Sequence, residues 1–215
     1  GVGFEANWEE YLLEEERHYK NARLHHKSFH LLYRTKKGFQ VKGGFQHFAL
    51  WGGNMENGRS NPLTQNYRDA ITLKHPSQHH LSSYEIYISK RFENFRLELL
   101  YNHIATDLSG RRFSNTPDGR YGLFFESHEK ERLINSVIYE LYYTQNQSYQ
   151  STWGADNYFN HFVYRTGWAF EEKIIGAPFF TYDREEEQVV NNKFTMHHIG
   201  IGGQYSTLKK NYPYR

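Results

Sequence analysis

The chain has 215 residues, of which 18% are aromatic, and it contains no cysteine. Its 26 Lys and Arg nearly balance its 24 Asp and Glu, and the mean hydropathy is -0.86. This balance does not favour nucleic-acid binding, because proteins that bind nucleic acid concentrate basic charge in patches. The lack of cysteine excludes disulfides and thiolate metal sites. No segment approaches the roughly 18 consecutive apolar residues of a membrane helix, so any bilayer crossing must use strands.

The first residues alternate like a strand and lack the basic start and apolar stretch of a signal peptide. Residues 8–20 bunch acidic residues with leucines, which fits either a helix or the end of a strand followed by a charged turn. Residues 211–215 show no closing element. We therefore expect the chain to be a mature or truncated piece of a longer protein.

From Arg23 onward, the alternation of apolar and polar residues predicts β-strands. The predicted strands are residues 25–34, 39–51, 83–92, 95–106, 120–128 and 133–144. In the second of these, Phe39, Val41 and Phe45 share one face and Gln40 and Lys42 the other. Alternation this regular over a dozen residues suits a tilted membrane strand.

Short and long connections take turns along the chain. Short turns are expected at 35–38, 93–94 and 129–131, and long polar loops at 52–80, at 107–118 and from 145. Outer-membrane barrels have this asymmetry, with short periplasmic turns and longer extracellular loops. The pattern predicts an all-β fold, an antiparallel transmembrane β-barrel, present here as a partial barrel that forms an open curved sheet of about 8–10 strands.

The stretch 145–182 loses the alternation and crowds aromatic rings among Asn, Gln and Gly. Aromatic faces stack on sugar rings while nearby amides and carboxylates bond the hydroxyls, so the composition indicates a carbohydrate site. An interfacial aromatic girdle is the alternative for each ring. The candidate polysaccharide contacts are Trp51 at a strand end, Glu140 and Tyr142 in the lumen, and Trp153, Asp156, Asn157, Tyr158 and Trp168 in the aromatic stretch.

Glu140 belongs to a strand whose alternate residues Val137, Tyr139 and Leu141 form an apolar face, so its carboxylate is expected to face inward. Two interpretations stay open for it. The carboxylate contacts a ligand, or it pairs with an Arg or Lys across the barrel.

Three adjacent histidine pairs, residues 25–26, 79–80 and 197–198, raise the question of a metal site. Neighbouring residues of a strand point to opposite faces, so such a pair does not easily chelate one ion. The chain also lacks an HExxH pattern. We predict no metal site and no cofactor. Since GxSxG, P-loop and GxGxxG motifs are absent as well, we predict no catalytic residues and no enzymatic activity.

Five spaced motifs follow one another through residues 20–205. They are FQHFALWGG (45–53), DLSGRRFSNTPDGRYGL (107–123), YELYYTQNQS (139–148), GADNYFNHFVYRTGWAFEEKIIGAPFF (154–180) and MHHIGIGG (196–203). Together they resemble the Wzi family of capsule assembly proteins, especially its members from Bacteroidetes-like bacteria. The resemblance implies a bacterial outer-membrane β-barrel that holds capsular polysaccharide or exopolysaccharide at the cell surface without doing chemistry.

The resemblance also implies that residues 1–215 are the C-terminal portion of a single, larger barrel domain. The expected partners are the polysaccharide, outer-membrane lipid and the remaining N-terminal part of the same barrel, with no nucleic acid. Two alternatives stay open. One is an outer-membrane porin or diffusion channel, and the other is a soluble carbohydrate-binding β-protein.

Overall fold

The computed structural model describes residues 1–13, 18–55, 68, 79–106, 112–129, 131–149, 155–176, 178–207 and 210–214. Across these ranges the fold is all-β, and every element is a strand. Most strands belong to one large antiparallel sheet, which confirms the predicted class of fold.

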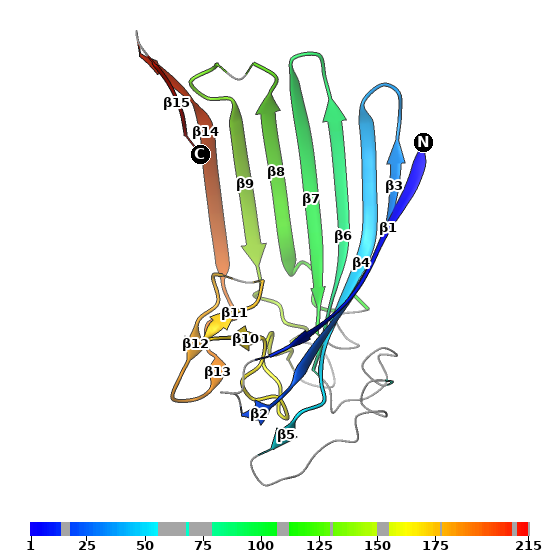
Figure 1. Cartoon of the computed structure of the whole chain (residues 1–215), viewed down its shortest axis with the longest axis vertical. Coiled ribbons are helices and arrows are strands. Elements are labelled where there is room, and N and C mark those ends of the chain that lie inside the picture. Colours follow the sequence, from blue (N-terminus) through cyan, green and yellow to red (C-terminus); the bar gives the residue numbers. More distant parts are fainter. Residues whose placement is uncertain are drawn as a thin grey trace.

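The large sheet has nine strands in the order β1-β3-β4-β6-β7-β8-β9-β14-β15, with β1 and β15 at its edges (Figure 1). Each strand pairs with its predecessor in the sheet, and all pairings are antiparallel. The strands are β1 (Val2–Leu12), β3 (Arg23–Arg34), β4 (Phe39–Trp51), β6 (His79–Arg91), β7 (Phe95–Ala105), β8 (Gly119–Ser127), β9 (Ser136–Tyr143), β14 (Thr195–Thr207) and β15 (Lys210–Tyr214).

The six predicted strands are confirmed to within a few residues at their ends, while one other expectation is wrong. Of the two interpretations of residues 8–20, the strand end is the one observed for residues 8–12, where Glu9 and Glu10 lie opposite His26 and His25 in β3 and bond to them. Residues 211–214 do form a closing strand, which pairs with β14. Pro213 is tolerated there because β15 is an edge strand, where a missing N–H costs no ladder bond.

The two ends of the sheet differ. One end, called here the hairpin end, carries the short connections between β3 and β4, β6 and β7, and β8 and β9 (Figure 1). The opposite end, called the loop end, carries the long connections. Three small two-stranded sheets lie there (Figure 1): β2 (Tyr19–Lys20) with β5 (Asn54–Met55), β10 (Ala169–Phe170) with β11 (Lys173–Ile174), and β12 (Tyr182–Asp183) with β13 (Gln188–Val189).

The hydrophobic core lies only at the loop end of the described structure. There, residues 155–194 pack against the strand ends, and the buried cluster joins both parts of the chain. Its members are Leu13, Tyr19, Ala22, Leu24, Leu50, Tyr158, Phe159, Tyr164, Trp168, Ala169, Ile174 and Val189.

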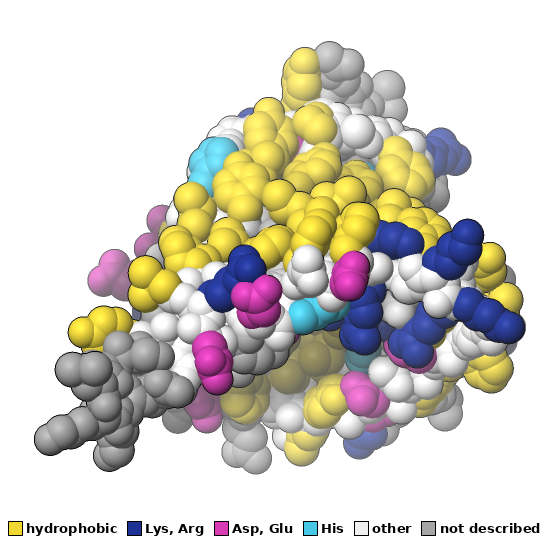
Figure 2. All heavy atoms as spheres, turned by 90° about the horizontal axis from the view of Figure 1, so that it is seen from above, with side chains coloured by type: hydrophobic (Ala, Val, Ile, Leu, Met, Phe, Trp, Pro, Cys, Tyr) yellow, Lys and Arg dark blue, Asp and Glu magenta, His cyan; other side chains and the backbone are white. Residues whose placement is uncertain are grey.

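The sheet has an apolar outer face and a polar inner face. Strand alternation places one set of side chains on the outer face, and the large apolar ones remain exposed: Val2, Phe4, Trp8, Phe29, Leu31, Tyr33, Phe39, Ile86, Ile88, Leu99, Leu123, Tyr139, Ile199 and Ile201. Seen from the hairpin end, hydrophobic side chains form a continuous band (Figure 2). The inner face carries the polar set, including Glu5, Gln46, Glu85, Asn102 and Glu140. Among the described residues, no helix has the length and apolar character to cross a membrane.

Candidate functional site

The inner face carries a buried carboxylate at Glu85, and both of its oxygens are hydrogen-bonded to side chains of other strands. His30 Nε2 lies 3.0 Å from one of its oxygens, while Gln46 Nε2 donates to the other at 2.7 Å and Asn102 Nδ2 at 2.6 Å. These partners come from β3, β4 and β7. A buried charge is tolerated only when it is paired and hydrogen-bonded, and Glu85 meets that condition.

Gly44 makes the contact between His30 and Glu85 sterically possible. In the register, Gly44 stands between His30 on one side and Glu85 on the other. A Cβ at position 44 would lie 2.2 Å from His30 Cδ2 and 2.5 Å from the carbonyl oxygen of Phe29. Only glycine leaves room for the imidazole to cross β4.

Glu140 is the second buried carboxylate of the inner face. Arg120 Nε donates to its Oε1 at 2.8 Å, a second guanidinium nitrogen contacts the same oxygen, and His198 Nδ1 lies 2.8 Å from Oε2. The Arg120 guanidinium also lies 5.6 Å from the centre of the Tyr142 ring. Glu140 is therefore ion-paired, but with Arg120 of the adjacent strand β8 and not with a residue across a barrel, while contact with a ligand stays a prediction.

A small cavity of about 150 Å³ separates the inner face from residues 155–194. Arg120 and Tyr142 line it from the sheet, and Phe179 lies edge-on to Tyr142 with ring centres 5.0 Å apart. The remaining lining residues include the rings of Phe159, Phe180 and Phe194, so the cavity places one cationic group beside several aromatic rings. Its size suits a single small group more than a chain of sugars.

The segment 155–194 is held to the strand ends by buried polar bonds. Tyr158 donates its hydroxyl hydrogen to Asp118 Oδ2 at 2.7 Å and accepts a bond from Asn115 Nδ2 at 2.6 Å. Asp118 also accepts from the backbone N–H groups of Asn146 and Gln147. Burial, assisted by the Asp118 carboxylate, raises the pKa of Tyr158 well above the usual tyrosine value, so its hydroxyl stays protonated.

Trp168 and Tyr164 anchor the same segment further along. The Trp168 indole N–H donates to His79 Nε2 at 2.9 Å, and the ring is only 1% exposed. The Tyr164 hydroxyl donates to the carbonyl of Gly52 at 3.1 Å. Burial raises the pKa of Tyr164 above its ordinary range as well.

A groove of about 440 Å³ opens on the surface of this segment, at the loop end. It is lined by Asn157, Asn160, His161, Phe162, Arg165, Glu186, Glu187 and Gln188. Phe162 is 76% exposed, an unusual position for a phenylalanine next to a packed core. We call this feature the Phe162 groove.

The amide groups of the Phe162 groove are fixed in place. Asn160 Nδ2 donates to Asn157 Oδ1 at 2.8 Å, and Val189 N donates to Asn160 Oδ1 at 2.8 Å. Asn192 Nδ2 donates to the same Asn157 oxygen at 2.6 Å. The Phe162 ring lies against His161 with centres 4.5 Å apart. An exposed ring beside oriented amides and charged groups can stack on a sugar and bond its hydroxyls.

The structure distributes the predicted site residues over several places. Asn157 lies exposed in the Phe162 groove, Tyr142 lines the small cavity, and Glu140 sits in its ion pair. Tyr158 and Trp168 belong to the core, so their ring faces pack against protein. The predicted site residues therefore do not form one continuous surface.

The other three predicted residues lie apart from these. Asp156 is buried and accepts a bond from Ser148 Oγ at 2.7 Å. Trp51 ends β4 with its indole N–H donating to Glu10 at 3.2 Å and the Arg23 guanidinium 5.4 Å from its ring centre. Trp153 lies outside the described residues.

Several residues of the Phe162 groove were not predicted from the sequence. Phe162 and Arg165 lie within the stretch 145–182 that its aromatic content had marked, but nothing in the pattern separated an exposed phenylalanine from buried ones. Glu186 and Gln188 come from a charged turn with no signal of its own, and only the fold brings them beside Asn157.

The three histidine pairs behave as strand geometry predicts, with the members of each pair on opposite faces. His25 bonds Glu10 and His26 bonds Glu9. In the same way, His79 contacts Trp168 while His80 Nδ1 lies 3.0 Å from His47 Nε2, and His197 contacts Tyr139 while His198 contacts Glu140. Within the described ranges, no group of three or more His, Asp or Glu side chains has a metal-binding arrangement.

Comparison with protein-family models, with curated proteins and with solved structures found no match for this chain.

Proposed function

We propose that this chain is part of a bacterial outer-membrane β-barrel that binds capsular polysaccharide or exopolysaccharide at the cell surface and performs no chemistry. The observation that carries the membrane part is the exposed apolar outer face of the sheet. The observation that supports the polysaccharide part is the Phe162 groove at the loop end, together with the resemblance of the sequence motifs to capsule assembly proteins of the Wzi family.

The outer face argues for a surrounding of lipid. Phe4 is 73% exposed, Leu31 56%, Leu99 52% and Ile199 65%, and these residues come from strands spread across the whole sheet. Soluble monomers rarely expose contiguous apolar patches beyond a few hundred Å². The inner face, by contrast, keeps its carboxylates hydrogen-bonded. This division supports the proposal, because transmembrane barrels alternate in the same way, apolar toward lipid and polar toward the lumen.

The edge strands β1 and β15 imply further pairing partners for the sheet. In hydrocarbon, an unpaired backbone N–H or C=O costs several kcal/mol, so an open edge is not stable there. We propose that further strands of the same barrel, the expected N-terminal part, complete the wall around the polar inner face.

The placement of the Phe162 groove fits a role at the cell surface. Outer-membrane barrels turn their short hairpins to the periplasm and their long loops outward. The groove lies with the long connections, so in this orientation it faces the medium, where surface polysaccharide is found. Phe162 supplies the stacking surface, and Asn157 and Gln188 supply polar groups for sugar hydroxyls.

The two alternatives are weaker on the same observations. A soluble carbohydrate-binding protein would have to leave the apolar outer face in water. A diffusion channel needs an open lumen, whereas residues 155–194 pack against the inner face at the loop end.

The test is substitution of Phe162 by alanine in the full chain. Since the ring is exposed and makes no core contact, folding should be unchanged, while affinity for the polysaccharide extracted from the producing cells should fall about tenfold, as expected for a lost stacking contact. Phe170, also exposed in this segment but outside the groove, gives the control Phe170→Ala, which should bind normally. Equal binding by wild type and Phe162→Ala would refute the groove as the site.

A further inference from the structure

A second concave site lies at the opposite end of the sheet, on its inner face. This pocket of about 590 Å³ is lined by Arg34, Thr35, Lys36, Gly38, Phe39, Gln40, Ser89, Arg91 and Arg96. Four of these residues are cationic and none of them is acidic. Seen from the hairpin end, Lys and Arg side chains gather on one side of the molecule (Figure 2). We call this feature the basic pocket.

The basic pocket places two like charges directly opposite each other across a strand pair. Arg91 in β6 and Arg96 in β7 are direct cross-strand partners, and both side chains lie on the inner face. Like charges placed directly opposite each other destabilise a strand pair. Arg96 is partly neutralised by Glu98, and Glu126 is its partner in β8. Among the described residues, Arg91 and Lys36 have no carboxylate partner.

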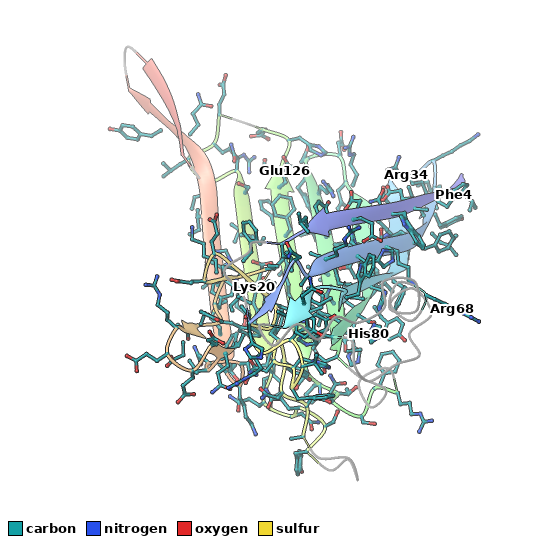
Figure 3. All side chains as sticks on the ribbon, turned by 60° about the horizontal axis from the view of Figure 1, so that its bottom comes forward. Phe4, Lys20, Arg34, Arg68, His80 and Glu126 are labelled. Carbon is teal, nitrogen blue, oxygen red and sulfur yellow. The ribbon has the colours of Figure 1, made fainter. Side chains whose placement is uncertain are left out.

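The backbone holds this cluster in a fixed geometry. The Arg91 N–H donates to the carbonyl of Gly38 at 2.8 Å, which ties β6 to the β3–β4 hairpin. Arg34 Nε donates to Gln40 Oε1 at 2.7 Å, which positions its guanidinium at the pocket. Figure 3 labels Arg34 and Glu126 at the hairpin end, far from Lys20 and His80 near the loop end. The basic pocket is therefore separate from the Phe162 groove.

The chemistry of the basic pocket selects for anionic oxygens. Guanidinium groups present forked N–H donors that match carboxylate and phosphate oxygens in two-point contacts. The remaining lining groups include Ser89, Gln40 and Thr35, whose hydroxyl and amide groups suit sugar hydroxyls. A lipid headgroup is the less favoured occupant, because the arginines lie on the polar inner face and not on the apolar outer one.

We propose that the basic pocket binds acidic sugar residues, so that the polysaccharide recognised by this protein is anionic and contacts the inner face at the hairpin end as well as the Phe162 groove. This inference rests on the proposed function. In the orientation argued above, the pocket opens toward the periplasmic mouth of the barrel, and it would hold uronate or phosphate groups of the polymer there.

The test measures binding of oligogalacturonate, a linear uronic acid polymer, to the full chain in detergent, with a neutral maltooligosaccharide as reference. Arg91→Gln should weaken oligogalacturonate binding about tenfold at low salt, and adding Arg96→Gln should remove most of what is left. Binding of the wild type should fall as salt is raised, because the contact is ionic. The control Arg132→Gln removes an exposed arginine at the same end that pairs with Glu129 outside the pocket, and it should bind like wild type.

Three results would overturn this inference alone, and a fourth would overturn the proposed function with it. One is equal binding by Arg91→Gln and Arg132→Gln. Another is a wild type that binds the extracted surface polysaccharide through Phe162 but not oligogalacturonate, which would leave the proposed function standing. The third is that Arg91→Gln weakens binding to vesicles containing anionic phospholipid but leaves binding of oligogalacturonate unchanged. That result would assign the pocket to lipid. A wild type that binds neither oligogalacturonate nor the extracted polysaccharide would overturn the proposed function together with this inference.

Discussion

The half of the sheet near the hairpin end, called here the hairpin half, and the loop end place their apolar side chains on opposite faces of the same strands. In the hairpin half, large apolar side chains such as Phe4, Leu31 and Ile199 lie on the outside and remain exposed, while the inner face is polar. At the loop end, the apolar side chains lie inside, where Leu24 and Leu50 pack under residues 155–194.

This difference supports the proposal that the two ends of the sheet lie in two different surroundings, one apolar and one aqueous. A core that excludes water, as at the loop end, is what a protein in contact with the aqueous phase requires. An apolar outer surface with a polar interior is stable only where the surrounding is itself apolar. The change from one arrangement to the other occurs within single strands: on the inner face of β4, the polar Gln46 is followed toward the loop end by Phe48 and the buried Leu50.

The largest expected effect is a loss of stability at the loop end. Trp168→Ala removes the biggest buried side chain of this region together with its bond to His79, and it should destabilise the packing of residues 155–194 by about 3–5 kcal/mol. Hydrogen exchange of backbone amides in this segment measures the change. The exposed Phe162→Ala serves as the control and should leave protection unchanged. Equal loss of protection in both variants would contradict the assignment of Trp168 to the core.

A somewhat smaller effect is expected in the hairpin half. Ile86→Arg places a charge on the exposed outer face of β6, and it should cost roughly 2–4 kcal/mol for insertion into a bilayer. Ser83→Arg puts the same side chain on the inner face of the same strand, where water can solvate it. Urea-dependent folding into lipid vesicles compares the two in the complete barrel, with the strands that pair with β1 and β15 present. If both substitutions cost the same, the outer face does not meet lipid.

The smallest expected effect is a difference in stability between two neighbouring glycine variants, one on each face of β4. Gly44→Ala would force a Cβ against the His30 ring and the Phe29 carbonyl, and it should destabilise the sheet by about 1–3 kcal/mol. At Gly43, on the outer face, the nearest atom to an added Cβ is the Glu85 carbonyl oxygen at 3.8 Å, so Gly43→Ala should be well tolerated. Denaturant midpoints of the two variants should therefore differ. Equal midpoints would show that His30 does not depend on the gap left by Gly44.

The regular alternation of the chain was enough to predict most of the sheet. The hairpin around residues 35–38 and the strand that begins at residue 39 are clear because Phe39, Val41 and Phe45 on the outer face are each followed by a polar residue on the inner face. Where alternation is lost, the sequence leaves more than one element open. Residues 8–12 carry consecutive acidic residues, and their strand depends on the histidines of β3 that pair with them.

The sequence by itself determined the class of fold, the alternation of short and long connections, and the separation of each histidine pair onto two faces, since strand periodicity is a local property of the backbone. Tertiary structure alone decided which aromatic rings of the stretch 145–182 are buried and which are exposed. That outcome depends on contacts between distant segments, such as Trp168 with His79 and Tyr158 with Asp118. The same reason explains why the basic pocket was not foreseen: its arginines come from separate strands and meet only in the assembled sheet.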